Sequence, residues 1–171
     1  ASRKDLSVRD LSHPDLSHPD LARSPNDLAG TSNRMRIMAA NTSTGNNQSY
    51  DPGEGLRIFQ GLHPDIALFQ EFNYGDNSDA TIRGFIDTAF GKSFSYFRET
   101  GAQIPNCVAS RYPIVSSGAW TDPSVSNRKF VWAQIDIPGP KDLWAVSVHL
   151  LTTSSTNRDN EAKALVADIN M

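Results

Sequence analysis

A run of apolar residues that finishes on an acid constrains the fold of this chain most. Residues 66 to 69 are Ile-Ala-Leu-Phe, with no polar interruption, and Gln70 and Glu71 follow directly. A short continuous apolar run that is preceded by a His-Pro turn indicates a buried strand. The fold must therefore bury this strand, and the strand delivers the carboxylate of Glu71 to its end.

Alternating strand and helix signals surround this run. Residues 35 to 40 (Met-Arg-Ile-Met-Ala-Ala) predict a strand, and Asp51 with Pro52 predicts the start of a helix that ends at Gly61. Asn77 or Ser78 is the expected cap of a second helix. This second helix has an apolar face made of Ile82, Phe85, Ile86 and Phe90.

The pattern after residue 93 is rich in strands. Five segments predict strands, at 94–99, 106–111, 114–120, 130–137 and 143–150. A third helix is expected from about residue 156, with an apolar stripe of Ala162, Leu165, Val166 and Ile169 that packs on one side of a sheet. This order predicts an α+β fold built of layers. No strand signal follows the last helix, so we expect the domain to be incomplete at its C-terminus.

The first residues have a different character. Asp-Leu recurs at 5–6, 10–11, 15–16 and 20–21, a period of five that fits neither a helix face nor a strand face. We therefore expect residues 1–32 to be a polar, disordered linker and residues 33–171 to be the domain. The chain begins at Ala1, so either a signal peptide has been removed or the sequence starts inside a longer chain; of the two, secretion is favoured.

Composition excludes some functions. The net charge of −3 lacks the basic footprint of a non-specific nucleic-acid binder, but it is compatible with an enzyme that meets phosphate through a metal ion. No apolar run approaches the roughly 18 residues of a membrane span. Cys107 is the one cysteine, which rules out an internal disulfide.

Three polar residues follow predicted strands. Asn41 comes after the strand at 35–40, Glu71 after the buried run, and His149 at the end of the segment at 143–150. Taken one at a time, each is most often a turn, solvent-exposed or core residue. Because ligands in layered α/β folds gather at strand ends, the three together predict a shared site.

Four stretches in this order resemble the endonuclease/exonuclease/phosphatase superfamily, the DNase I-like metal-dependent phosphodiesterases. They are Arg-Ile-Met-Ala-Ala-Asn, Asp-Ile-Ala-Leu-Phe-Gln-Glu, Asn-Cys-Val-Ala-Ser-Arg-Tyr-Pro-Ile, and Val-His-Leu with its following helix. The resemblance covers residues 35 to 171. It implies a DNase I-like layered α/β sandwich, of which this chain is the N-terminal portion.

The resemblance also implies a role for each site residue. Glu71 becomes the ligand of Mg²⁺ or Mn²⁺, with Ca²⁺ as an alternative, because these hard ions prefer oxygen. Asn41 orients the metal site or a phosphate oxygen. His149 lies beside the scissile phosphate, with its other nitrogen held by a carboxylate. Asn106 and Arg128 match phosphate-binding positions, although a turn residue and a solvated strand start are equally good interpretations of these two.

The implied activity is divalent-metal-dependent phosphodiester hydrolysis, with an endonuclease favoured and nucleic acid preferred to phospholipid. The family's Asp-x-Asn motif and terminal Asp-His pair have no counterpart in this chain, so the expected partner is a C-terminal half that carries the missing acids. Alternatives are a sphingomyelinase or phosphoinositide-type phosphoesterase and a non-catalytic binding domain on the same scaffold. A Cys107–His149 hydrolase is disfavoured, because Cys107 lies in an apolar strand.

Overall fold

A computed structural model describes residues 34–43 and 53–171. The predicted linker at 1–32 and the predicted helix cap at Asp51 lie outside these residues. The described elements, in chain order, are β1 (Ile37–Asn41), α1 (Glu54–Leu62), β2 (Ile66–Gln70), α2 (Asp79–Phe90), β3 (Ser95–Arg98), β4 (Cys107–Ser110), β5 (Ile114–Trp120), β6 (Phe130–Ile135), β7 (Leu143–Ser147) and α3 (Ser155–Ile169).

The observed boundaries follow local chemistry. The side chain of Ser78 accepts a hydrogen bond from the Thr81 backbone N–H, so Ser78 caps α2 as expected. Helix α1 begins later than predicted, at Glu54, because Gly53 takes the cap position with a left-handed φ of 111°. Strand β7 ends at Ser147 rather than near residue 150.

Sheet A has the strand order β1-β2-β4-β3, with β1 and β2 parallel and the other pairs antiparallel. Strands β2 and β4 are central and carry apolar residues on both faces, because successive side chains point to opposite sides. Ala67 and Phe69 face the core under α1 and α2, whereas Ile66 faces the opposite core. This two-sided burial explains the continuous apolar run of the sequence.

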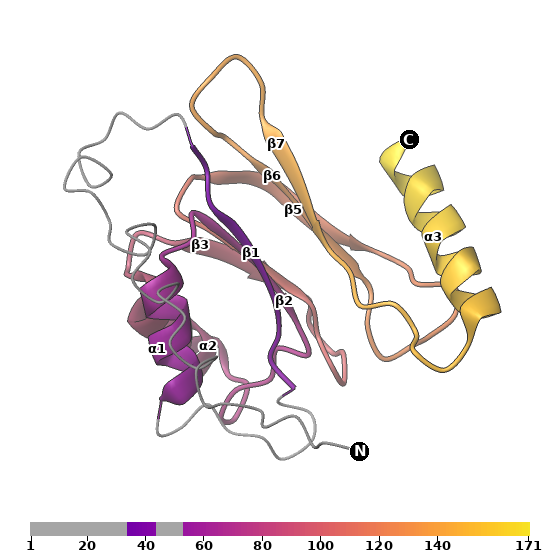
Figure 1. Ribbon diagram of the computed structural model, residues 1–171, viewed down its shortest axis with the longest axis horizontal. Helices are drawn as coiled ribbons and strands as arrows, with labels where there is room; N and C mark the ends of the chain where they lie inside the picture. Colours follow the sequence, from indigo (N-terminus) through magenta and orange to yellow (C-terminus); the bar gives the residue numbers. More distant parts are fainter. Residues whose placement is uncertain (1–33, 44–52) are drawn as a thin grey trace, which may run out of the picture. The chain divides into compact units, whose positions relative to one another are not determined.

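Sheet B is an antiparallel sheet with the order β5-β6-β7. Its inner face supplies Val131, Ala133, Ile135 and Ala145 to a core shared with Ile66 and Val108 of sheet A. The layers are therefore helices α1 and α2, then sheet A, then sheet B (Figure 1). This arrangement confirms the predicted α+β sandwich.

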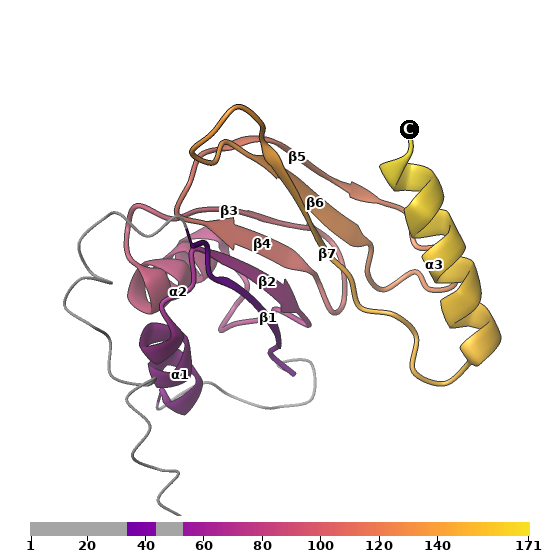
Figure 2. The same cartoon turned by 45° about the horizontal axis from the view of Figure 1, so that its top comes forward.

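Helix α3 departs from the expectation that it packs on a sheet. It stands beyond the ends of the sheet B strands (Figure 2), and Val166 and Ile169 of the predicted apolar stripe are 57% and 59% exposed. The buried residue of α3 is instead an acid, Glu161, which is 0% exposed. The expectation was wrong because polar contacts, not the apolar stripe, attach this helix. At 15 residues α3 is the longest described helix, and none within residues 34–43 and 53–171 is long and apolar enough to cross a membrane.

Candidate active site at the strand ends

Glu71 lies one residue beyond β2 in a left-handed backbone conformation, with φ of 54°. This conformation costs a residue with a side chain about 1–2 kcal/mol. The neighbouring chain holds it in place: the Thr42 hydroxyl donates to the Glu71 carbonyl oxygen at 2.8 Å, and the Thr42 backbone N–H donates to that of Gln70 at 2.9 Å. Thr42 is 1% exposed. A strained residue held by its surroundings is typical of a functional position.

Asn41 is the last residue of β1 and pairs with Gln70 in the parallel register, so it lies beside the end of β2. Its Nδ2 donates to Oε1 of Glu71 at 2.9 Å. Its Oδ1 accepts from the Ser43 backbone N–H at 2.8 Å. Because the Ser43 contact settles which amide atom is the acceptor, the Asn41 amide is oriented with its donor toward Glu71.

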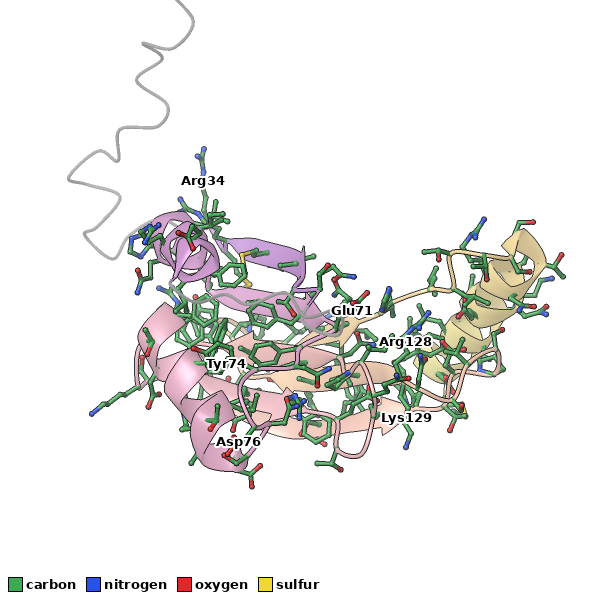
Figure 3. All side chains as sticks on the ribbon, turned by 90° about the horizontal axis from the view of Figure 1, so that it is seen from below. Arg34, Glu71, Tyr74, Asp76, Arg128 and Lys129 are labelled. Atoms are coloured by element: carbon green, nitrogen blue, oxygen red, sulfur yellow. The ribbon has the colours of Figure 1, made fainter. Side chains whose placement is uncertain are left out.

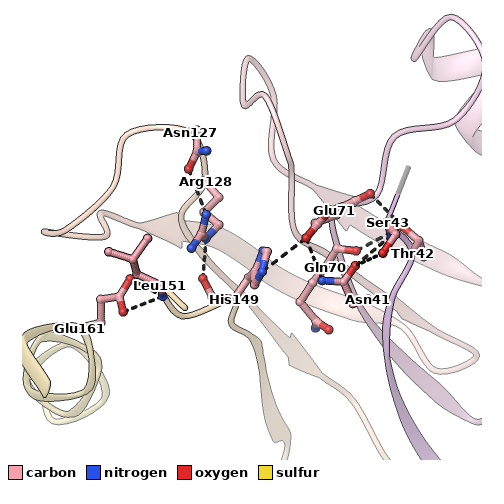
Figure 4. Close-up of polar contacts among 10 residues, drawn as sticks. All are labelled: Asn41, Thr42, Ser43, Gln70, Glu71, Asn127, Arg128, His149, Leu151 and Glu161. Atoms are coloured by element: carbon pink, nitrogen blue, oxygen red, sulfur yellow. Dashed lines mark hydrogen bonds and ion pairs between the residues drawn. The ribbon is translucent and has the colours of Figure 1, made fainter. Parts of the chain in front are cut away.

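His149 follows β7 by two residues and approaches the same carboxylate. Its Nε2 lies 3.5 Å from Oε1 of Glu71 (Figure 4). Its Nδ1 is buried, and among the described residues it has no hydrogen-bond partner. Burial lowers the pKa of His149 below its ordinary value, the charge of Arg128 lowers the pKa further, and Glu71 opposes both effects. The imidazole is therefore neutral near pH 7.

Arg128 lies at the same end of the strands as Glu71 (Figure 3). Its Nε donates to the backbone carbonyl of His149, and its Nη1 donates to Oδ1 of Asn127 at 3.1 Å. Arg128 is 6% exposed. These contacts give the guanidinium a position directly behind His149 and leave little of it for a ligand to reach.

Asn106 has no exposed surface. Its Nδ2 donates to the Lys129 carbonyl at 2.6 Å, and its backbone N–H donates to Oε2 of Glu99 at 3.3 Å. The Lys129 backbone N–H donates to the same Glu99 atom at 3.0 Å. Asn106 thus joins the start of β4 to the start of β6. This geometry favours a structural role, and phosphate binding by Asn106 stays a prediction.

Two residues that hold the site were not anticipated. Thr42 fixes the backbone of Glu71 as described above. Glu161 of α3 accepts hydrogen bonds from the Leu151 backbone N–H at 2.9 and 3.1 Å and so fixes the loop that follows His149. Thr42 could have been found as a polar residue next to the candidate Asn41. Glu161 could have been found as an acid on the face of the predicted helix that was expected to pack.

The donor set suits a hard divalent ion that retains much of its water. Mg²⁺ is commonly bound through one or two carboxylates together with waters and substrate phosphates. Glu71 provides one carboxylate, and its side chain is 17% exposed. Within residues 34–43 and 53–171 no group of three or more His, Cys, Asp or Glu side chains is placed to hold a metal. The residues present therefore fit a partial magnesium site, not a complete protein cage.

No family model and no curated protein sequence matches the chain. Solved structures do match its fold. Humanized TDP2 of D. rerio has a TM-score of 0.60 at 18% identity over 80% of this chain and 56% of its own length. An endonuclease/exonuclease/phosphatase family protein from Leptotrichia buccalis has a TM-score of 0.57 at 16% identity over 80% of this chain and 62% of its own.

A third solved structure is the 3′ phosphatase NExo from Neisseria, bound to a product DNA hairpin. It has a TM-score of 0.51 at 14% identity over 80% of this chain and 51% of its own. The chain therefore spans between half and two thirds of the length of these structures. The described residues have the fold of the endonuclease/exonuclease/phosphatase proteins, as the four sequence stretches predict.

Proposed function

We propose that this chain is the N-terminal portion of a divalent-metal-dependent phosphodiester hydrolase that acts on nucleic acid. The observation that carries the proposal is the convergence of Asn41, Glu71 and His149. They come from the ends of β1, β2 and β7, in two different sheets, and both Asn41 and His149 approach one oxygen of Glu71. Packing alone gives no reason for these three side chains to meet.

Glu71 is the proposed ligand of Mg²⁺ or Mn²⁺, with Ca²⁺ as an alternative. Such an ion supplies positive charge that stabilises the transition state of phosphodiester hydrolysis. Asn41 orients the carboxylate through its Nδ2 hydrogen bond. His149, neutral near pH 7, is placed to hydrogen bond with a phosphate oxygen or with the reacting water. Arg128 adds positive charge behind His149, which favours an anionic substrate.

The C-terminal half of the same domain is the proposed partner. The buried Nδ1 of His149 lacks a partner among the described residues. A side chain supplied by that half would form a hydrogen bond with it. The exposed stripe of α3 is a surface that further layers of the fold can cover. The proposal assigns the remaining acids of the active site to this segment.

Nucleic acid is the proposed substrate class. One of the matched structures is a 3′ phosphatase bound to a DNA hairpin, and that likeness supports a nucleic-acid substrate over a phospholipid. A sphingomyelinase or phosphoinositide-type activity is the alternative that the assay below separates.

Metal binding can be tested on the 171-residue chain without an activity assay. Mn²⁺ broadens the NMR signals of nearby nuclei, so we expect selective loss of the Asn41 and Glu71 backbone amide signals. Glu71→Gln should abolish the effect. Glu54→Gln, on an exposed helix position with 67% of its side chain accessible, should not. Equal broadening in both variants would overturn the metal assignment.

Hydrolysis is tested on the protein purified from its natural source. We expect Mg²⁺-dependent cleavage of DNA that a chelator abolishes, and no release of phospholipid head groups. Head-group release in place of DNA cleavage would overturn the nucleic-acid substrate and favour a lipid phosphodiesterase. Binding of DNA without cleavage at any metal concentration would instead indicate a non-catalytic binding domain.

A further inference from the structure

Two strands from different sheets lead into the site, and a hydrogen bond joins their last residues. Gln70 is the last residue of β2 and Ser147 the last of β7. The Gln70 Nε2 donates to the Ser147 Oγ at 3.0 Å, and the Ser147 hydroxyl donates to the Phe69 carbonyl at 2.7 Å. The Ser147 hydroxyl thus has both a donor and an acceptor partner, although the residue is 0% exposed.

The packing of β2 against β7 is otherwise apolar, and the hydrogen bonds of Asn106 and Glu99 to Lys129 join β4 and β3 to β6 instead. Sheets A and B meet through Ile66, Val108, Val131, Ala133 and Ala145, all apolar. Apolar packing is non-directional, so by itself it tolerates small shifts of one sheet over the other. Hydrogen bonds require both a distance and an angle, and they fix the relative position of the groups that make them. The Gln70–Ser147 link is therefore the directional contact between β2 and β7.

The link lies next to the residues that must meet. Glu71 follows Gln70 directly, and His149 follows Ser147 by two residues. A displacement of one residue along a strand moves a side chain by about 3.3 Å. That shift is close to the 3.5 Å that separates Nε2 of His149 from Oε1 of Glu71. Loss of the link would remove the hydrogen bonds between the ends of β2 and β7 while the ladders within each sheet remain.

We propose that Gln70 and Ser147 are positioning residues that lock β2 against β7 so that Glu71 meets His149. Their catalytic meaning rests on the function proposed above, in which these two side chains act together. The geometry itself can be measured without any activity.

The experiment is a nuclear Overhauser measurement on the isotopically labelled 171-residue chain. The signal falls with the sixth power of distance, so the cross-peaks between the Glu71 side-chain methylenes and the His149 ring protons report the pair directly. We expect these cross-peaks to be lost in Ser147→Ala. The Hα cross-peaks within each sheet, Ala67 to Ala109 and Ala133 to Ala145, should persist, which a general loss of structure would not allow.

Three further variants complete the test. Ser116→Ala, the same substitution at an exposed position of β5, should retain the Glu71–His149 cross-peaks. Ser147→Thr restores the hydroxyl and should restore them. Gln70→Met removes the amide at a similar side-chain length and replaces Ser147→Ala as the deciding variant if the latter does not fold.

Retained Glu71–His149 cross-peaks in the deciding variant would overturn the inference, as would loss of the cross-peaks within the sheets alongside them. Failure of the natural protein to cleave DNA would overturn the proposed function while leaving this geometric result intact. The two ideas therefore fail separately.

Discussion

Oε1 of Glu71 lies 2.9 Å from Nδ2 of Asn41 and 3.5 Å from Nε2 of His149. One carboxylate oxygen is thus approached by two side chains, one from the neighbouring strand of sheet A and one from the loop after sheet B. These contacts fix where the Glu71 carboxylate lies, and Glu71 in turn raises the pKa of His149 against the effect of burial. The predictions below test the contacts and the residues that support them.

The pKa of His149 should lie below its ordinary value of 6.5 in the folded, metal-free chain. Burial is the main cause, the charge of Arg128 adds to it, and Glu71 acts in the opposite direction. Glu71→Gln should therefore lower the pKa further, because it removes the one opposing charge. Titration of the His149 ring protons by NMR, in the presence of a chelator, measures both values. A folded-state pKa at or above 6.5 would contradict the prediction.

The same shift predicts how stability depends on pH. Below pH 6.5 the unfolded chain binds a proton at residue 149 that the folded chain does not yet bind, so the free energy of unfolding falls as the pH falls from 6.5 to the folded-state pKa. Above pH 6.5 this contribution is fully present. Urea denaturation of the chain and of His149→Gln at several pH values isolates it, because the contributions of all other groups are common to both proteins.

Backbone strain at Glu71 can be measured by comparing two substitutions. Both Glu71→Ala and Glu71→Gly remove the side chain, but glycine alone adopts φ of 54° without a steric cost. We expect the glycine variant to be the more stable of the two by about 1 kcal/mol. Urea denaturation gives the difference. An alanine variant as stable as the glycine variant would mean that the left-handed conformation is not strained.

Asn106→Ala should destabilise the fold by about 1–3 kcal/mol, because it removes a fully buried side-chain amide that donates to the Lys129 carbonyl. If Asn106 acts only on phosphate, the free energy of unfolding should not change. The matched control is Asn160→Ala on the exposed side of α3, for which we expect a change within about 0.5 kcal/mol. Chemical denaturation of the three proteins distinguishes the two roles.

Cys107 should resist alkylation in the folded chain. It is 0% exposed, and burial raises the pKa of its thiol far above the ordinary value. The thiolate is the reactive form, so iodoacetamide at pH 8 should react only at the rate of unfolding. Mass spectrometry follows the reaction. Rapid alkylation of the native chain would return the Cys107–His149 hydrolase to consideration.

Glu161→Ala should loosen α3 while leaving the sheets folded. The carboxylate accepts the Leu151 backbone N–H with both oxygens, and its loss should cost about 1–3 kcal/mol. Hydrogen exchange should rise in α3 before it rises in β2 or β6. Asp159→Ala is the control, because Asp159 makes a surface contact to Lys163 at 3.2 Å, worth about 0–1 kcal/mol.

Local patterns predicted the sandwich correctly. The apolar run that became β2 is buried on both faces, as its lack of polar alternation indicates. The Ser78 cap set the start of α2 through one side-chain hydrogen bond. Such features depend on residues that are neighbours in the chain, and they can therefore be predicted from the sequence.

Tertiary contacts decided the packing of α3 and the burial of Asn106, which the sequence pattern did not determine. The apolar stripe of α3 predicted packing on a sheet, yet Val166 and Ile169 are exposed and the helix is attached by Glu161. A helical stripe states which face can be buried, not what lies opposite to it. The burial of Asn106 likewise depends on Glu99 and Lys129, which no local pattern joins to it.

The sequence by itself determined which residues end the strands: Asn41, Glu71 and the region of His149 each follow an apolar segment. It could not determine that these ends meet. The parallel register of β1 with β2 brings Asn41 to Glu71, and the stacking of sheet B on sheet A, with Ser147 bonded to Gln70, brings His149 to the same oxygen. Periodicity records the environment of each segment, whereas distances between segments arise from how the whole chain packs.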